Sequence, residues 1–171
     1  IVQNVGLARE GSDPICQDTG FHVFFVELGA DVHVTGGPIA DAITDGLRDG
    51  SSEGFLRNSI LGDPLERVNT GDNTPPVIHV ELVPGDRFKI TLAPKGGGSE
   101  NLSRLMMLKP ADGEEGVRKF VIETISLAGG NPCPPVVVGV GIGGTFEKCA
   151  MLAKKAVMRS VGSANPVDKY A

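Results

Sequence analysis

The amino-acid sequence predicts an α/β protein in which helices flank a mixed β-sheet. Short runs of β-branched and aromatic residues alternate along the chain with longer runs whose apolar residues recur at helical spacing. A length of 171 residues is sufficient for one domain with its own apolar core. We therefore expect a single domain over residues 1–171, although the order of its strands does not follow from these patterns.

The first strand is predicted at residues 21–28 (FHVFFVEL), which are rich in aromatic and β-branched residues and contain no glycine or proline. Residues 31–34 are a candidate continuation of this strand. A helix is expected next, because Pro38 suits a first helical position and the apolar residues of 39–47 fall on one face. The stretch 49–54 (DGSSEG) is expected to end that helix.

Two strands separated by a turn are predicted in the middle of the chain. Residues 77–83 (VIHVELV) and 88–92 (FKITL) have strand composition, and the sequence Pro-Gly-Asp at 84–86 is a turn signal. We expect these two strands to pair as a β-hairpin. The segment before them, residues 57–73, is expected to be irregular, and a glycine-rich loop (KGGGSE, 95–100) is expected to follow them.

The last third of the chain predicts two helices with a strand between them. Apolar residues at helical spacing predict a helix over 114–128, which the glycines at 129–130 end. Residues 134–140 (PPVVVGV) have the composition of a buried strand. A second helix is predicted over 146–160, and its apolar face includes Cys149.

Composition and charge exclude several classes of partner. The net charge is −5 and no stretch is strongly basic, so we expect neither nucleic acid nor an anionic membrane to be bound. No apolar run approaches the roughly 20 residues that span a bilayer. The start of the chain lacks the pattern of a secretion signal, which favours a cytoplasmic protein. Because the first residue is Ile1 rather than Met, we expect a fragment of a longer chain.

Three cysteines in 171 residues are too few for a disulfide scaffold. Cys16 lies in a polar loop before the first strand (PICQDTG), and Cys133 lies in a loop stiffened by prolines (GNPCPP). The residues themselves leave two interpretations for both positions, a metal ligand or a small buried apolar side chain. Cys149 falls on the apolar face of a predicted helix, and we interpret it as a core residue.

Two glycine-rich motifs suggest ligand binding by backbone groups. Residues 95–99 (KGGGS) can direct several N–H groups at an anion beside the charge of Lys95, with a flexible loop tip as the alternative. The glycines at 139, 141 and 144 match the dinucleotide fingerprint. That fingerprint needs another strand after the helix, which residues 162–166 (GSANP) do not supply. A dinucleotide-binding domain and a non-catalytic structural domain remain the alternatives to an enzyme.

Six segments taken together resemble one family, the iron–sulfur hydro-lyases. They are CQDTG (16–20), LRNS (56–59), NTGDNTPP (69–76), PKGGGSENLS (94–103), GNPCPPVVVGVGIGG (130–144) and FEKCAMLAKKA (146–156). The resemblance is to class I fumarate hydratases and to the alpha subunit of tartrate dehydratase, and the lysine followed by three glycines is more similar to the fumarate hydratases. It implies the fold of the alpha-type catalytic domain of these enzymes.

The resemblance implies a [4Fe–4S] cluster that is held by three cysteines and leaves one iron open to the substrate. Carried over to this sequence, Cys16 and Cys133 are two of the ligands. The family's third ligand lies far beyond the second, so Cys149 does not match it and the third ligand is expected outside this chain. The helical segment that precedes CQDTG in the family is also not expected in this sequence.

The resemblance further implies a site for a small dicarboxylate. It places Gln17 and Asp18 beside the substrate, where Asp18 would transfer or orient a proton. Arg57 would bind one substrate carboxylate, and the turn containing Lys95, Gly97 and Gly98 would cradle a carboxylate through its backbone. The residues alone also allow Asp18 to hold its own turn and Arg57 to be a solvated surface side chain.

Other polar residues are expected to have supporting or structural places. They are Asn69, Thr70 and Asn73, which we interpret as a polar loop, and His22, His33 and His79, which we interpret as structural or exposed.

The reaction that the resemblance implies is the reversible hydration of fumarate to malate, a step of the tricarboxylic acid cycle. A tartrate dehydratase type of hydro-lyase is the alternative. The remaining substrate residues, including the main catalytic base, are expected from a beta subunit or a C-terminal catalytic domain. We therefore expect the chain to be inactive alone, and a homo-oligomer is compatible with the sequence.

Overall fold

A computed structural model of the chain describes residues 2–11, 15–165 and 167. Its internal contacts divide the chain into two compact units, Ile1–Asn101 and Leu102–Ala171, and each unit is described by itself. The elements of the first unit are α1 (Val2–Gly11), β1 (Phe21–Gly29), α2 (Ile39–Glu53), β2 (Val77–Val83), β3 (Phe88–Lys95) and α3 (Gly97–Glu100). Those of the second are η1 (Pro110–Asp112), α4 (Gly113–Ala128) and α5 (Phe146–Ala156). A mixed sheet accompanied by helices confirms the predicted α/β class.

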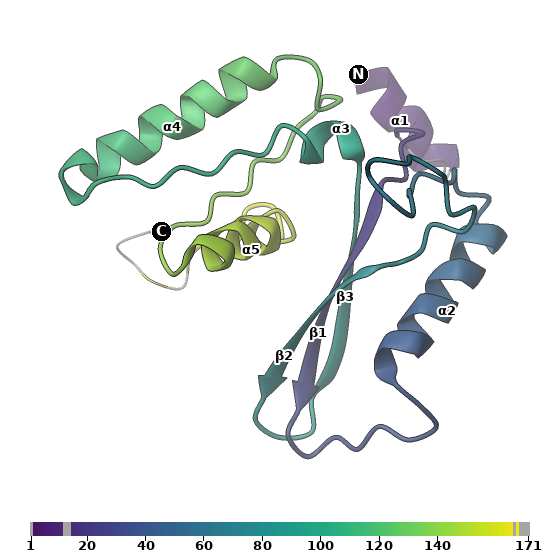
Figure 1. Cartoon of the computed structure of the whole chain (residues 1–171). Helices are drawn as coiled ribbons and strands as arrows, with labels where there is room; N and C mark the ends of the chain where they lie inside the picture. Colours follow the sequence, from purple (N-terminus) through teal and green to yellow (C-terminus); the bar gives the residue numbers. More distant parts are fainter. Residues whose placement is uncertain (1, 12–14, 166, 168–171) are drawn as a thin grey trace. The chain divides into compact units, whose positions relative to one another are not determined.

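The sheet has the strand order β2-β1-β3, with β1 parallel to β2 and antiparallel to β3. Figure 1 shows β1 between the other two strands. The predicted hairpin of β2 and β3 is therefore wrong, because the turn after β2 leads the chain to the opposite edge of the sheet. The central place goes to the most apolar strand, whose Val23, Phe24, Phe25 and Val26 are all buried.

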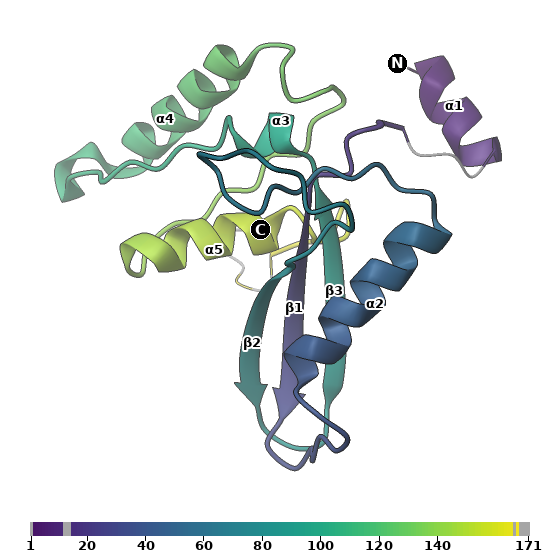
Figure 2. The ribbon, with the colours of Figure 1, turned by 45° about the vertical axis from the view of Figure 1, so that its right-hand side comes forward.

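The apolar core of the first unit lies between the sheet and α2. Phe24 and Val26 of β1 are buried together with Ile43 and Leu47 of α2. Figure 2 shows α2 lying across the sheet. The helix continues to Glu53, so the prediction that residues 49–54 end it is corrected. The buried residues Ile43, Leu47 and Ser51 recur every four positions, and packing of this stripe outweighs the weak helix propensity of glycine and serine.

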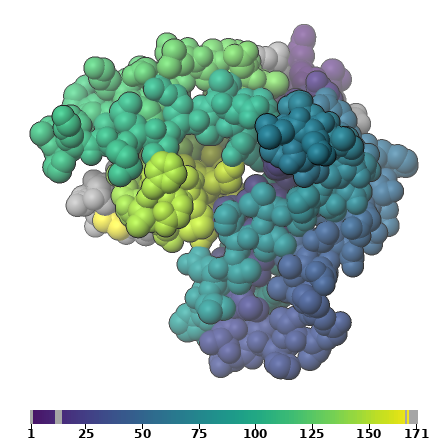
Figure 3. All heavy atoms as spheres, in the orientation of Figure 1, coloured from purple at the N-terminus to yellow at the C-terminus, as the bar shows by residue number. Residues whose placement is uncertain are grey.

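Several local predictions in the first unit are confirmed and others are corrected. Residues 2–11 form a helix, whereas no helix was expected before CQDTG. Residues 31–34 form a turn and a coil instead of continuing β1. Residues 97–100 form a single helical turn rather than a loop. The segment between α2 and β2 is irregular as predicted, with one isolated bridge between Leu61 and Asn69, and Figure 3 shows it as a compact mass of blue-green spheres on the surface.

The second unit confirms both predicted helices, although α5 ends at Ala156 instead of residue 160. The predicted buried strand at residues 134–140 is wrong. These residues lie outside any strand, and Val137 is 70% exposed. A strand needs a hydrogen-bonded neighbour, and the described part of this unit contains no strand that could pair with it. Within the described residues of the unit, Ala128 is the one buried side chain.

Candidate functional site

Two of the motifs meet in the first unit. The carboxylate of Asp18, from CQDTG, accepts a long hydrogen bond of 3.5 Å from the backbone N–H of Gly98, from KGGGS. A Cβ atom at Gly96 would lie 3.2 Å from Asp18 Oδ2, closer than ordinary van der Waals contact. The absence of side chains on this turn therefore allows the Asp18 carboxylate to reach its backbone.

Gly20 brings the two motifs together. It has φ +61°, and a Cβ atom here would lie 2.0 Å from the carbonyl oxygen of Lys95. Phe21, the next residue, is paired with Lys95 at the end of the β1–β3 ladder. A residue with a side chain could neither adopt this backbone conformation readily nor fit against Lys95. The sequence CQDTG thus requires its final glycine to place Asp18 over α3.

The thiol of Cys16 is partly exposed and not in a disulfide. Its Sγ accepts the backbone N–H of Asp18 at 3.5 Å and lies 3.7 Å from Oε1 of Gln17. Hydrogen bonds from backbone N–H groups to sulfur stabilise thiolates and tune metal clusters that thiolates hold. The geometry around Cys16 is therefore suited to a ligand and unlike that of a buried apolar cysteine.

Lys95 is largely buried, and its side chain contacts two residues of the turn that follows it. Its Nζ forms a short hydrogen bond with Ser99 Oγ and lies 3.5 Å from a carboxylate oxygen of Glu100. Only 20% of its side chain is exposed. The lysine therefore orders the glycine turn, and its positive charge lies directly beside the backbone that Asp18 contacts.

Arg57 lies in the irregular segment that follows α2, and its side chain is exposed. Among the residues that the structure describes, no hydrogen bond or ion pair engages its guanidinium group. By contrast, Arg48 on α2 is held by Asp45 at 2.7 Å and by Asp72 at 3.0 Å. The guanidinium of Arg57 is thus available for a ligand, whereas no contact joins it to Asp18 or Gly98.

Cys133 lies in the second unit, in a turn where its N–H group bonds to the carbonyl of Gly130 at 3.4 Å. Its thiol is exposed and outside any disulfide. Its φ is +57°, a conformation that is uncommon for residues other than glycine. Strained backbone of this kind is concentrated at functional sites, which favours a ligand over a core cysteine.

The glycines of the dinucleotide-like motif have a packing role in the second unit. A Cβ atom at Gly141 would lie 2.1 Å from the carbonyl oxygen of Cys149, and one at Gly139 would lie 2.1 Å from that of Ala153. These glycines let the preceding segment lie directly against α5. Cys149 is half-buried rather than enclosed in a core, and its thiol bonds to the carbonyl of Phe146 at 3.2 Å.

The histidines of the first unit and the carboxylate of Asp72 lie in contrasting surroundings. His22 is buried, and burial lowers the pKa of its imidazole. His79 stacks on Phe25 with 5.1 Å between ring centroids, and His33 is exposed, so the structural interpretation of the histidines is confirmed. Hydrogen bonds from Thr74 and Arg48 lower the pKa of Asp72 to about 2. The sequence analysis did not single out Asp72.

The described residues do not by themselves complete a metal site. Nowhere in residues 2–11, 15–165 and 167 do three histidine, cysteine, aspartate or glutamate side chains gather closely enough to hold a metal ion. Likewise, none of the helices described in this chain is both long and apolar enough to cross a membrane.

Comparison with known proteins gives consistent matches. The model of the family described as fumarate hydratase (fumerase) matches residues 1–171. A Methanocaldococcus jannaschii protein with the provisional name L(+)-tartrate dehydratase subunit alpha is 44% identical over 168 residues, which cover 95% of this chain and 59% of the relative. The L(+)-tartrate dehydratase subunit alpha of Escherichia coli strain UTI89 is 37% identical over 172 residues, covering 98% of this chain and 56% of the relative. The chain thus spans less than three fifths of the length of these relatives.

Proposed function

The chain belongs to the fumarate hydratase (fumerase) family, and on this basis we propose that it forms the cluster-binding part of a hydro-lyase that acts on a small dicarboxylate. One observation carries the proposal. The CQDTG loop and the glycine turn are in contact in the first unit. The backbone N–H group of Asp18 donates to the Cys16 thiol, and the Asp18 carboxylate accepts from the backbone of Gly98. A metal ligand, a proton carrier and an anion-binding backbone are the parts that a hydro-lyase site needs.

Cys16 and Cys133 are the ligands that this chain would supply to a [4Fe–4S] cluster. Neither thiol is in a disulfide, Cys16 receives an N–H group, and Cys133 has a strained backbone, so the donors fit a cluster. Cys149 bonds to its own helix and is not proposed as the third ligand, which would come from outside this chain. When bound, a cluster with an open iron supplies a Lewis acid that polarises the substrate hydroxyl and carboxylate.

The chain's own residues would bind the substrate and move a proton. The Arg57 guanidinium can form two parallel hydrogen bonds with one substrate carboxylate. The backbone of Gly97 and Gly98, with Lys95 beside it, can receive another carboxylate. The Asp18 carboxylate lies at this same backbone, within reach of a substrate held there, and a carboxylate so placed can transfer a proton. Asp18 is therefore the proposed proton carrier, and Gln17 contributes an amide to substrate binding.

We propose fumarate as the substrate, hydrated reversibly to malate, because the lysine-preceded GGG turn resembles the fumarate hydratases. The names of the relatives, which are alpha subunits of L(+)-tartrate dehydratase, favour dehydration of L(+)-tartrate as the second candidate. Both substrates are small dicarboxylates, and both reactions add or remove water at a carbon beside a carboxylate. The same residues of this chain would serve either reaction.

The proposed enzyme includes a beta subunit or a C-terminal catalytic domain, which would supply the main catalytic base. The word alpha in the relatives' names is in keeping with a partner of this kind. We also propose that the enzyme works in the cytoplasm, where thiols remain reduced and able to bind a cluster.

The test uses the complete protein with its partner, reconstituted with iron and sulfide without oxygen. Iron content, visible absorption, fumarate hydration and L(+)-tartrate dehydration are measured on the same sample. We expect a brown protein with about four irons that acts on one of these dicarboxylates far better than on the other. The preferred substrate decides between the two candidates.

Cysteine variants test the ligand assignment. Cys16→Ser and Cys133→Ser are each expected to lose the cluster absorption and to lower activity by about 100-fold or more, since the Lewis acid contributes several kcal/mol. Cys149→Ser is the matched control, expected to keep both the iron content and the activity. Full iron content and activity in either Cys16→Ser or Cys133→Ser would remove that residue from the ligand set.

A further inference from the structure

Arg57 lies in a segment without regular structure. Residues 56–60 leave α2 where the N–H group of Leu56 bonds to the carbonyl of Ser51 at 3.0 Å. A segment outside helices and strands keeps one conformation only where its polar backbone groups find partners. The direction of the Arg57 side chain therefore depends on the contacts made by residues 58–60.

Five hydrogen bonds join this segment to the NTGDN loop, and asparagine side chains make three of them. They are Asn58 Nδ2 to the Gly71 carbonyl (2.7 Å), Asn69 Nδ2 to the Asn58 carbonyl (3.0 Å), the Ser59 N–H to Asn73 Oδ1 (2.7 Å), and the Thr70 N–H and hydroxyl to the Ile60 carbonyl (2.9 and 3.3 Å). The two motifs that carry Arg57 and Asn73 are thus bound along most of their length.

Asn73 differs from the other asparagines of this network. It is 0% exposed, whereas Asn58 and Asn69 are exposed. Water can replace a hydrogen bond at the surface, but a buried N–H group that loses its acceptor remains unsatisfied. Asn73 also has φ +60°, a conformation that asparagine tolerates better than most residues. This position therefore favours asparagine for two reasons, its left-handed backbone and its buried amide oxygen.

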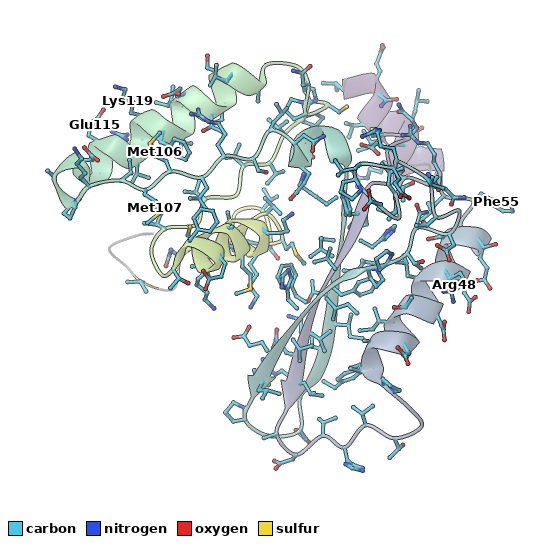
Figure 4. The ribbon with its side chains drawn as sticks, viewed as in Figure 1. Arg48, Phe55, Met106, Met107, Glu115 and Lys119 are labelled. Atoms are coloured by element: carbon cyan, nitrogen blue, oxygen red, sulfur yellow. The ribbon has the colours of Figure 1, made fainter. Side chains whose placement is uncertain are left out.

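The loop that carries Asn73 is itself fixed to α2. Asp72 accepts hydrogen bonds from the N–H group and the hydroxyl of Thr74 at 3.1 and 2.7 Å, and from Arg48 Nε at 3.0 Å. Arg48 lies on α2, as Figure 4 shows. The residue next to Asn73 is therefore bonded to a helix that packs on the sheet. Asn73 in turn accepts the N–H group of Ser59, which lies two residues from Arg57.

We propose that Asn73 is a positioning residue for Arg57, holding the segment 57–59 so that the guanidinium meets a substrate carboxylate. The inference rests on the carboxylate-binding role of Arg57 in the proposed function. Asn73 acts through Ser59 and has no contact with the substrate itself. Its loss should therefore weaken substrate binding rather than the chemical step.

The test is a double-mutant cycle of Asn73→Gly and Arg57→Ala in the complete, reconstituted enzyme. Glycine keeps the left-handed conformation but removes the whole buried side chain, including the amide oxygen that accepts the Ser59 N–H group. We expect Asn73→Gly to raise the KM for the preferred dicarboxylate by about tenfold, the effect of losing one charged hydrogen bond between the displaced Arg57 guanidinium and the substrate carboxylate, with kcat nearly unchanged. In the Arg57→Ala background the same substitution is expected to change KM by less than about twofold, since coupled residues are not additive.

Asn69→Gly is the matched control. It also removes an asparagine of the same network, whose Oδ1 accepts the Gly71 N–H group at 2.8 Å and whose Nδ2 donates to the Asn58 carbonyl at 3.0 Å, but at an exposed position. We expect it to leave KM within about twofold of the parent, because water replaces both lost bonds at an exposed position. Asn73→Asp keeps an acceptor for the Ser59 N–H group but places a carboxyl group at a fully buried position, so it is expected to restore only part of the affinity lost in Asn73→Gly.

The outcomes separate the inference from the function on which it rests. Equal effects of Asn73→Gly in both backgrounds, or an unchanged KM with lower iron content, would mean that Asn73 only supports the fold. An unchanged KM in Arg57→Ala would remove Arg57 from the substrate site, and the inference with it. If Asn73→Gly yields no folded protein, Asn73→Ser replaces it in the double-mutant cycle. The serine side chain is shorter than that of asparagine, so its hydroxyl does not reach the Ser59 N–H group.

Discussion

Backbone conformations with positive φ mark the residues around the proposed site. Asn73 and Cys133 have φ of +60° and +57°, and Phe55, two residues before Arg57, has φ +51° while its side chain is 94% exposed. Figure 4 shows Phe55 extending away from the ribbon. A bulky residue rarely adopts this conformation without compensation from its surroundings. Two of the motif segments, and the residue that precedes a third, therefore have left-handed backbone, which the sequence alone does not reveal.

His22 makes the stability of the first unit dependent on pH. It is 3% exposed, and burial lowers its pKa below the ordinary value of 6.5. Between pH 6.5 and the lower folded pKa the unfolded chain binds more protons than the folded one, so the free energy of unfolding falls as the pH falls through this interval. We expect His22→Leu to remove this part of the pH dependence, measured by urea unfolding at pH 7.5 and at pH 5.5.

The exposed His33 provides the control for that prediction. His33→Leu also replaces a histidine by leucine, but at an exposed position, and is expected to leave the difference between the two pH values as in the parent. An unaltered difference in His22→Leu would show that other groups cause the acid sensitivity.

At the scale of elements, close contact between a backbone segment and a helix defines the second unit. Gly139 and Gly141 lie against the backbone of α5, and each position excludes a Cβ atom. In a dinucleotide site, glycines at the same spacing let the backbone approach a pyrophosphate group instead. Here the glycines are explained by helix packing, and the described chain has no strand after α5.

This packing predicts the effect of a single methyl group. Gly141→Ala is expected to lower the free energy of unfolding by about 1–3 kcal/mol, the usual cost of overpacking. Gly130→Ala, in the same unit, meets no atom within 4 Å and is expected to change stability by less than about 0.5 kcal/mol. Chemical denaturation of the complete protein measures both. Equal stability of the two variants would contradict the contact between Gly141 and α5.

At the scale of the whole molecule, much apolar surface is uncovered. In the second unit Ile122 and Leu127 of α4 are about two-thirds exposed, at 67% and 65%. Figure 4 shows Met106 on the side of its segment that faces α4 and Met107 on the other side, where it is 75% exposed. Such surfaces mark interaction sites.

We expect the partner of the proposed enzyme to cover part of this surface. The chain alone should bind a fluorescent dye that reports exposed apolar groups, and the dye signal should fall when the beta subunit or C-terminal domain is added. An unrelated soluble protein added at the same concentration is the control and should leave the signal unchanged. An equal signal with and without the partner would show that the apolar surface has another role.

The sequence determined most of the elements and the chemical types in the site. β1, β2 and α4 lie within a residue or two of their predicted bounds, because their apolar spacing is a local property that neighbouring residues set. The thiols of Cys16 and Cys133 and the carboxylate of Asp18 could be selected from the chemistry of their side chains and their motifs. The substrate and the residues that bind it stay predictions.

Only the tertiary structure decided which of these parts meet. The insertion of β1 between β2 and β3 depends on burying the most apolar strand, a long-range preference that local patterns do not encode. The contact of Asp18 with Gly98 follows from that insertion, since β1 and β3 carry the two motifs to one end of the ladder. The hydrogen bond from the Ser59 N–H group to Asn73 arises because a loop folds back over its own chain, and this fold buries the asparagine side chain that serves as the acceptor.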